Sequence, residues 1–315
     1  MAFLMRRGRW QRTTSFAERM TGIMWGETGL GQNQAMLTMA PAPETPAPAA
    51  VRPTLSWKSV GLPIEHGGWS FLVEPLILGL VVAPSLAGAS LAVSATAAFL
   101  ARHPFKLVVL DRRRGVRYPR TGLAERFFSA YATIAASAFT FALWLGGAAI
   151  LTPLVAAAPL ALLALGRDLQ GRGREALPEV AGALGLGASA TAIILAGGGV
   201  PATAWLAWAL GAARAATAIL YVRARVRVDR GVDGQTRAAL ARPVMVVHAG
   251  ALVLALVALR AAWLPPIAAS AFLLLLLRAV HGLAPGCAPI RAQVLGIQEV
   301  LVGAACLYLF AAGLA

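Results

Sequence analysis

The sequence predicts an all-α integral membrane protein with about nine transmembrane helices. Its composition is strongly apolar, since 58% of the 315 residues are hydrophobic and only 13% are charged. The mean hydropathy is +0.70. The apolar residues come in runs of about 16 to 22, each long enough to cross roughly 30 Å of hydrocarbon as a helix. A soluble globular domain has neither this composition nor such a series of runs.

The predicted spans follow one another closely from residue 69 to the C-terminus. Their boundaries are set where charged residues, Gly or Pro interrupt the apolar runs. In chain order the predicted spans are Trp69–Ser85, Leu91–Leu110, Phe127–Gly146, Ala148–Leu165, Glu179–Ala196, Ala202–Val222, Val244–Leu259, Pro266–Val280 and Val294–Ala315.

The first 60 residues differ from the rest of the chain. The stretch "MAPAPETPAPAAVRP" is rich in Pro and Ala and cannot bury a core. The residues before it contain no apolar run long enough for a secretory signal. We therefore expect residues 1–60 to be a disordered cytoplasmic tail and residues 61–315 to be the polytopic transmembrane domain. The sequence allows a start at Met1 or at Met39, which opens the low-complexity stretch.

The loops alternate in charge, and this alternation predicts the orientation. Six arginines lie in residues 111–126 and six in residues 222–242, whereas the intervening short loops hold only Arg260. By the positive-inside rule the basic loops and the N-terminus face the cytoplasm, and nine spans leave the C-terminus outside. This topology, with attraction to anionic lipids, accounts for the net charge of +15. Membrane lipids are therefore the expected partners, and nucleic acid is not.

Charged side chains within the predicted spans gather in their cytoplasmic halves. Most of them suit a helix terminus, with carboxylates at N-terminal ends and cations at C-terminal ends. Glu74 does not, because it lies about 13 Å along the helix axis from Glu65. Arg102 and Lys106 share one helix face, and Arg214 lies well inside the sixth span. We expect Glu74 to pair with one of these three cations, either around a wet cavity open to the cytoplasm or as a purely structural buried pair.

Four motifs carry a resemblance to a known family. They are "EHGGW" before the first span, "RHPFK" in the second, "GRGREALPEVAGAL" before the fifth and "LYVRARVR" at the end of the sixth. With these motifs the chain resembles the YwiC-like family of bacterial membrane proteins over roughly residues 60–315. The resemblance implies a multi-pass protein of the bacterial cytoplasmic membrane and carries no particular reaction with it.

The chain also resembles, more distantly, the UbiA-type intramembrane prenyltransferases, which implies a UbiA-like helix bundle. Those enzymes hold Mg²⁺ and a prenyl diphosphate with two Asp-rich motifs after the second and sixth spans. The corresponding positions are His103, Leu107 and Asp111 in the first motif, and Tyr221, Arg225 and Asp229 in the second. Only the last position of each motif is a carboxylate, whereas Mg²⁺ needs several oxygen ligands.

Two functional hypotheses follow. In the first, the protein is a transporter or lipid-binding protein, has no cofactor, and binds a small anion, a proton or a lipid head group in a cytoplasm-facing polar cavity. Glu65, His66 and Glu74 would form one wall of this cavity, with Arg102, Lys106 and Arg214 opposite. The full set of candidate ligand-binding residues is Glu65, His66, Glu74, Arg102, His103, Lys106, Arg214 and Arg225.

In the second hypothesis, the protein is an atypical UbiA-like transferase for a prenyl diphosphate or another lipid. Asp111, Asp229 and Asp233 would then be the remaining Mg²⁺ ligands, with Asp111 and Asp229 at the rim of the cavity. The missing carboxylates favour the first hypothesis. The sequence names neither the substrate nor a catalytic residue, and it does not indicate the oligomeric state.

Overall fold

The computed structural model describes residues 5–6, 9–10, 56–63 and 68–314. The chain divides into two units, Met1–Pro53 and Thr54–Ala315. In the first unit, β1 (Met5–Arg6) and β2 (Arg9–Trp10) form an antiparallel pair. The predicted disorder of residues 1–60 falls almost entirely outside the described residues. Within that stretch, the short helix α2 (Trp57–Gly61) belongs to the second unit.

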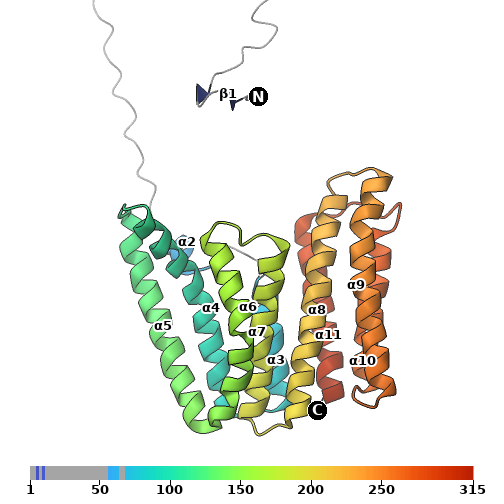
Figure 1. Cartoon of the computed structure of the whole chain (residues 1–315), viewed down its shortest axis with the longest axis horizontal. Coiled ribbons are helices and arrows are strands. Elements are labelled where there is room, and N and C mark those ends of the chain that lie inside the picture. The colour runs from blue at the N-terminus through green and yellow to red at the C-terminus, as the bar shows by residue number, and fades with distance from the viewer. Residues whose placement is uncertain (1–4, 7–8, 11–55, 64–67, 315) are drawn as a thin grey trace, which may run out of the picture. The chain divides into compact units, whose positions relative to one another are not determined.

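The second unit is all-α, as predicted (Figure 1). Each of the nine predicted spans corresponds to one helix, and a 3-10 turn, η1 (Ala148–Ile150), precedes the fourth of them. The helices are α3 (Gly68–Val82), α4 (Leu86–Arg113), α5 (Pro119–Gly146), α6 (Leu151–Leu169), α7 (Ala176–Ala196), α8 (Pro201–Val228), α9 (Gly234–Arg260), α10 (Pro266–Leu283) and α11 (Ala292–Leu314).

Eight helices in the described part of the chain are long and apolar enough to cross a membrane. The protein is therefore a multi-pass membrane protein. The remaining apolar helix, α3, has 15 residues, a length of about 22 Å. This length is less than the thickness of the hydrocarbon core of a bilayer, which is about 30 Å. The four residues before α3 lie outside the described residues.

Consecutive long helices run up and down, so the connections after α4, α6, α8 and α10 all lie at one end of the bundle (Figure 1). These are the four basic loops, and we call this end the basic end. Here the helices continue past the predicted spans, with α8 extending to Val228 instead of Val222. The sequence interpretation ended each span at its first charges, but backbone hydrogen bonding continues into the polar region until a capping residue is reached.

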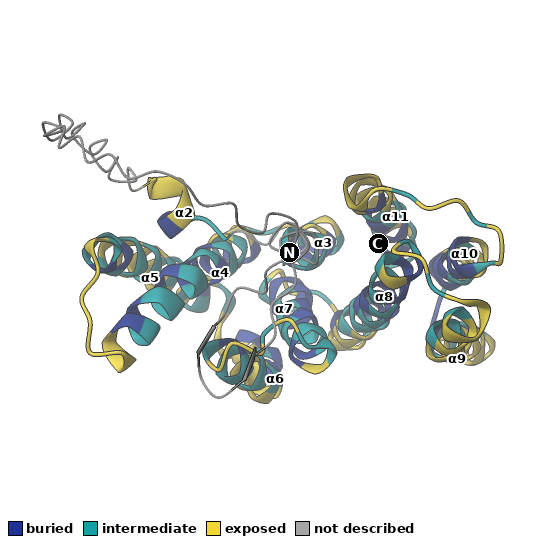
Figure 2. Ribbon diagram, turned by 90° about the horizontal axis from the view of Figure 1, so that it is seen from above, coloured by how far each residue is buried: buried dark blue, intermediate teal, exposed yellow. Residues whose placement is uncertain are grey.

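Helix α7 lies at the centre of the N-terminal part of the bundle and packs against α3, α4, α6 and α8 (Figure 2). Its many Ala and Gly residues allow this, because small side chains let membrane helices approach closely. Gly79 of α3 illustrates the fit, since a Cβ added there would lie 2.8 Å from Cβ of Ile193 on α7. The outer faces expose large apolar side chains such as Leu254 and Tyr308, as expected for contact with lipid.

Candidate functional site

A cavity of about 810 Å³ lies among α3, α4, α6, α7 and α8. This volume is in the usual range for small-molecule sites. Its lining follows α7 from Pro178 to Ser189, eleven residues along the helix, or about 17 Å. Most of the lining is Ala, Gly, Leu, Phe and Val, and its charged residues are five arginines and one glutamate. The cavity is therefore long and apolar with a strongly basic region.

The basic region of this cavity lies at the basic end of the bundle. Arg223 and Arg227 lie four residues apart on α8, and Arg230 follows three residues later in the connection between α8 and α9. Arg174 joins them from the α6–α7 connection, and Arg102 from α4. We call these five side chains the arginine cluster.

The members of the arginine cluster differ in how far their charge is neutralised. Arg223 Nη1 lies 2.9 Å from Oε2 of Glu179, the one carboxylate in the lining. The ion pairs among the described residues include none that involves Arg174, Arg227 or Arg230, and all three are exposed. The cluster therefore carries an excess of positive charge and has hydrogen-bond donors available to an anion.

Asp168 binds Arg102 and Lys106, a role that the sequence interpretation missed. Its Oδ2 accepts from Arg102 Nη2 at 2.9 Å and its Oδ1 from Lys106 Nζ at 2.6 Å. The two cations do share a face of α4, as predicted, but that face meets the end of α6 and not Glu74. A lone Asp in the Arg-rich stretch "GRDLQGRGR" was the available signal.

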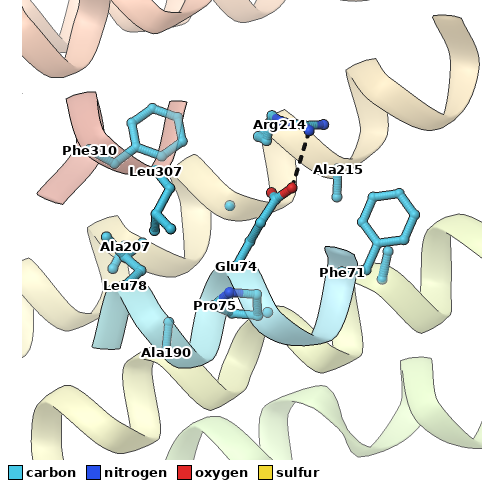
Figure 3. Close-up of a pocket in the computed structure, with 13 residues that line it drawn as sticks. Phe71, Glu74, Pro75, Leu78, Ala190, Ala207, Arg214, Ala215, Leu307 and Phe310 are labelled. Carbon is cyan, nitrogen blue, oxygen red and sulfur yellow. Dashed lines mark hydrogen bonds and ion pairs between the residues drawn. The ribbon is translucent and has the colours of Figure 1, made fainter. Parts of the chain in front are cut away.

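Glu74 pairs with Arg214, one of the three predicted partners (Figure 3). Glu74 Oε1 lies 3.2 Å from Arg214 Nη2, and the Arg214 side chain is only 3% exposed. Both residues line a second cavity of about 30 Å³. Arg102, Glu74 and Arg214 were predicted to share one cavity, whereas Arg102 lines the large cavity and Glu74 and Arg214 line the small one.

A second buried ion pair lies near the first. Arg278 Nη1 of α10 donates to both carboxylate oxygens of Glu299 on α11, at 2.7 and 2.8 Å. The Arg278 guanidinium also stacks over the ring of Tyr221, 4.2 Å from its centroid. Arg214 Nη2 links the two pairs by donating to the backbone oxygen of Glu299 at 3.4 Å. Charged groups from four helices thus meet inside the bundle.

Arg225 lines neither cavity, although it was a predicted ligand-binding residue. Its buried guanidinium donates to the backbone oxygens of Gly282 and Ala288, to Cys287 Sγ at 3.0 Å, and to Asp229. It therefore fastens α8 to the connection between α10 and α11.

Two further predicted residues that the structure describes, His103 and Lys106, line neither cavity. His103 Nε2 lies 3.1 Å from the backbone oxygen of Ser59 and so links α4 to α2. Glu65 and His66 lie outside the described residues.

The comparisons with known proteins bear on the half of the bundle that contains α3 to α7. Residues 62–194 match the model of the YwiC-like protein family. The predicted resemblance to the YwiC-like family is thus confirmed over this range, which contains Glu74, Arg102 and Asp168. Arg214 and the α8 members of the arginine cluster lie beyond it. No curated protein and no solved structure matched the chain, so the more distant UbiA-like resemblance stays a prediction.

The carboxylates that a UbiA-like enzyme would use for Mg²⁺ do not fit that role in this chain. Asp111 is fully buried and accepts from Arg120 at 3.0 Å and from the Thr121 hydroxyl at 2.8 Å. Asp229 pairs with Arg225. The described residues contain no group of three or more His, Cys, Asp or Glu placed to hold a metal ion.

Asp233 is a helix cap in the structure. Its Oδ1 accepts from the Thr236 backbone N–H at 2.8 Å, and this bond holds the pKa of the Asp233 carboxyl below its usual value. The cap therefore stabilises the fold above the pKa of the unfolded chain and is lost as the pH falls through the lower folded pKa.

We accordingly expect Asp233→Ala to lower the melting temperature in detergent slightly at neutral pH. The difference from wild type should shrink as the solution is acidified, and it should be the same in Mg²⁺ and in EDTA. A deficit that appears only in Mg²⁺ would instead identify Asp233 as a metal ligand.

Proposed function

We propose that the protein binds an anionic amphiphile in the large cavity and serves in the binding or transport of such a lipid. The head group would lie against the arginine cluster and the apolar chain along α6 and α7. The observation that carries this proposal is the combination of five arginines with a long apolar lining in one cavity.

Several properties of the cavity support this ligand class over a small inorganic anion. A small anion needs only a few donors and leaves most of 810 Å³ unfilled, whereas an alkyl or isoprenoid chain gains about 0.8 kcal/mol for each CH₂ group that it buries. The apolar length of about 17 Å along α7 accommodates a chain of that kind. Arginine suits the head group because its planar guanidinium binds phosphate or carboxylate through paired hydrogen bonds.

The transferase hypothesis has less support. Glu179, the one carboxylate in the cavity lining, already pairs with Arg223. Asp111, Asp229 and Asp233 are absent from that lining. A diphosphate could still bind to the arginine cluster, but the described residues offer no set of oxygen ligands for a Mg²⁺ ion beside it.

The proposal can be tested by titrating the purified protein with dioleoylphosphatidic acid in a neutral detergent, with dioleoylphosphatidylcholine as the comparison lipid. Arg227→Gln combined with Arg230→Gln should weaken phosphatidic acid binding at least tenfold, because each charged hydrogen bond contributes about 1.5–3 kcal/mol before solvent screening. Excess inorganic phosphate should compete poorly because it lacks the apolar chain.

The control variant is Arg113→Gln combined with Arg114→Gln. It removes the same charge from exposed positions at the basic end that line neither cavity. It should bind phosphatidic acid like wild type. Equal weakening in both double variants would show that binding depends on surface charge and not on the arginine cluster, which would contradict the proposal. Equal affinity of wild type for both lipids would also refute it.

We also propose that the basic end faces the cytoplasm and that the protein lies in a bacterial inner membrane. The four basic connections at that end support this orientation. Alkaline phosphatase fused after Ala315 should be active, and the same enzyme fused after Gly115 should be inactive. The reverse pattern would contradict the orientation.

A further inference from the structure

Glu74 is a carboxylate at membrane depth with room beside it. Its side chain is 20% exposed, although it projects from α3 into the bundle. The exposure is to the small cavity of about 30 Å³, which is space for about two water molecules. The small cavity therefore has room for water beside the Glu74 carboxylate.

The ion pair that holds Glu74 is weaker than the neighbouring pair of Arg278 and Glu299. Glu74 has one contact with Arg214, at 3.2 Å, whereas Glu299 has two shorter contacts with Arg278, at 2.7 and 2.8 Å. Arg214 Nε and Nη1 are buried and have no hydrogen-bond partner among the described residues. Glu74 therefore satisfies only part of the hydrogen-bonding capacity of Arg214. Unpaired donors beside a cavity favour bound water.

Gly303 of α11 makes the pairing possible. A Cβ added to Gly303 would collide with Glu74 Oε1 and would lie 2.9 Å from Arg214 Nη2. The absence of a side chain at this position leaves the space in which the carboxylate meets the guanidinium.

The small cavity adjoins the large one. Phe71 and Ala183 line both cavities, and Glu74 lies three residues after Phe71 on the same face of α3. A ligand in the large cavity is therefore separated from the Glu74 cavity by these two side chains.

We propose that Glu74 is a proton-exchange site and that its protonation is linked to occupancy of the large cavity by an anion. The second part rests on the proposed function. A proton taken up from bulk solvent and passed on through water in the small cavity binds to a Glu74 carboxylate oxygen, which leaves the neutral acid beside a guanidinium that stays protonated. Glu74, Arg214, Arg278 and Glu299 together then change from zero net charge to +1.

An anion in the neighbouring cavity offsets this charge, since charges interact strongly where the surroundings are apolar. Protonation of Glu74 gives this buried cluster a net positive charge, because its other members are two arginines and one further carboxylate. The groups that interact with Glu74 from other helices are Arg214 on α8 and Glu299 and Cys306 on α11. Arg278 on α10 and His248 on α9 interact in turn with Arg214. By linkage, an anion that favours protonated Glu74 is itself bound more tightly when Glu74 is protonated.

The proton site can be tested without any ligand by infrared difference spectroscopy of purified protein during an acid titration. Wild type should gain a carboxylic acid C=O band that Glu74→Gln lacks and that the control Glu125→Gln, at a partly exposed position outside both cavities, retains. Glutamine keeps an oxygen to accept from Arg214. If Glu74→Gln does not fold, Glu74→Asp should shift the position of the band. An unchanged band in Glu74→Gln or Glu74→Asp would overturn the proposal.

The linkage is tested by repeating the titration with saturating dioleoylphosphatidic acid. The Glu74 band should then appear at a higher pH than in the ligand-free protein. A band that titrates identically with bound lipid would overturn the linkage and leave lipid binding intact. Absence of lipid binding would refute the proposed function, whereas the ligand-free titration would still decide whether Glu74 exchanges a proton.

Discussion

Arg225→Met is expected to lower the free energy of unfolding in detergent by about 3–5 kcal/mol, the range measured when one partner of a buried ion pair is removed. Arg225 is 2% exposed and its partner Asp229 is 9% exposed. The substitution keeps an apolar side chain of similar length but leaves the Asp229 carboxylate and two backbone oxygens without their donor. The contact between α8 and the α10–α11 connection should loosen as a result.

The matched control is Arg227→Met, two residues further along the same helix. Arg227 is exposed and belongs to no ion pair among the described residues, so its replacement should change the unfolding free energy by less than about 0.5 kcal/mol. Equal effects of the two substitutions would show that Arg225 does not hold the connection in place.

Glu74→Ala is expected to be destabilising by about 3 kcal/mol, because it leaves the buried charge of Arg214 without its carboxylate. The comparison is the double substitution Glu125→Ala and Glu179→Ala. Both glutamates form pairs with partly exposed arginines, and such surface pairs contribute about 0–1 kcal/mol each.

Thermal unfolding in the same detergent measures both Glu74→Ala and the double variant. The single substitution should lower the melting temperature more than the double one. A Glu74→Ala protein as stable as wild type would mean that water, and not Glu74, compensates the charge of Arg214.

The helices could be predicted from sequence because the membrane acts on each of them separately. A run such as Ala202–Val222 must be helical to satisfy its own backbone in hydrocarbon, whichever helices lie beside it. The end of α8 could not be placed equally well, since the stretch up to Val228 is polar and its helicity depends on contacts such as those of Arg225.

The partners of the buried charges could not be fixed from sequence, because they depend on which helix faces which. Glu74 had three candidate cations, and only the packing of α3 near α8 and α11 selects Arg214. Asp168 was missed because its partners come from α4, more than 60 residues away. Charge at a helix end is ordinary, so the sequence gives no reason to single it out.

Of the arginine cluster only Arg102 was predicted, although a signal for the members near the end of α8 was present. Arg223, Arg227 and Arg230 recur at helical spacing, which indicates a shared environment. The sequence interpretation attributed most loop arginines to topology and to lipid attraction. The cavity appears only when α8 is placed beside α6 and α7.

Mass spectrometry of lipid retained by the protein tests the proposed cavity ligand most directly. Wild type and two tryptophan variants are purified from membranes and exchanged into fresh detergent. Ala98→Trp places a bulky ring at an exposed position in the cavity lining, and Ala136→Trp places the same ring on an exposed position of α5 outside it. Wild type and Ala136→Trp should retain an amphiphile with an anionic head group, and Ala98→Trp should lose it. Equal retention by both variants, or a retained lipid without an anionic group, would contradict the proposal.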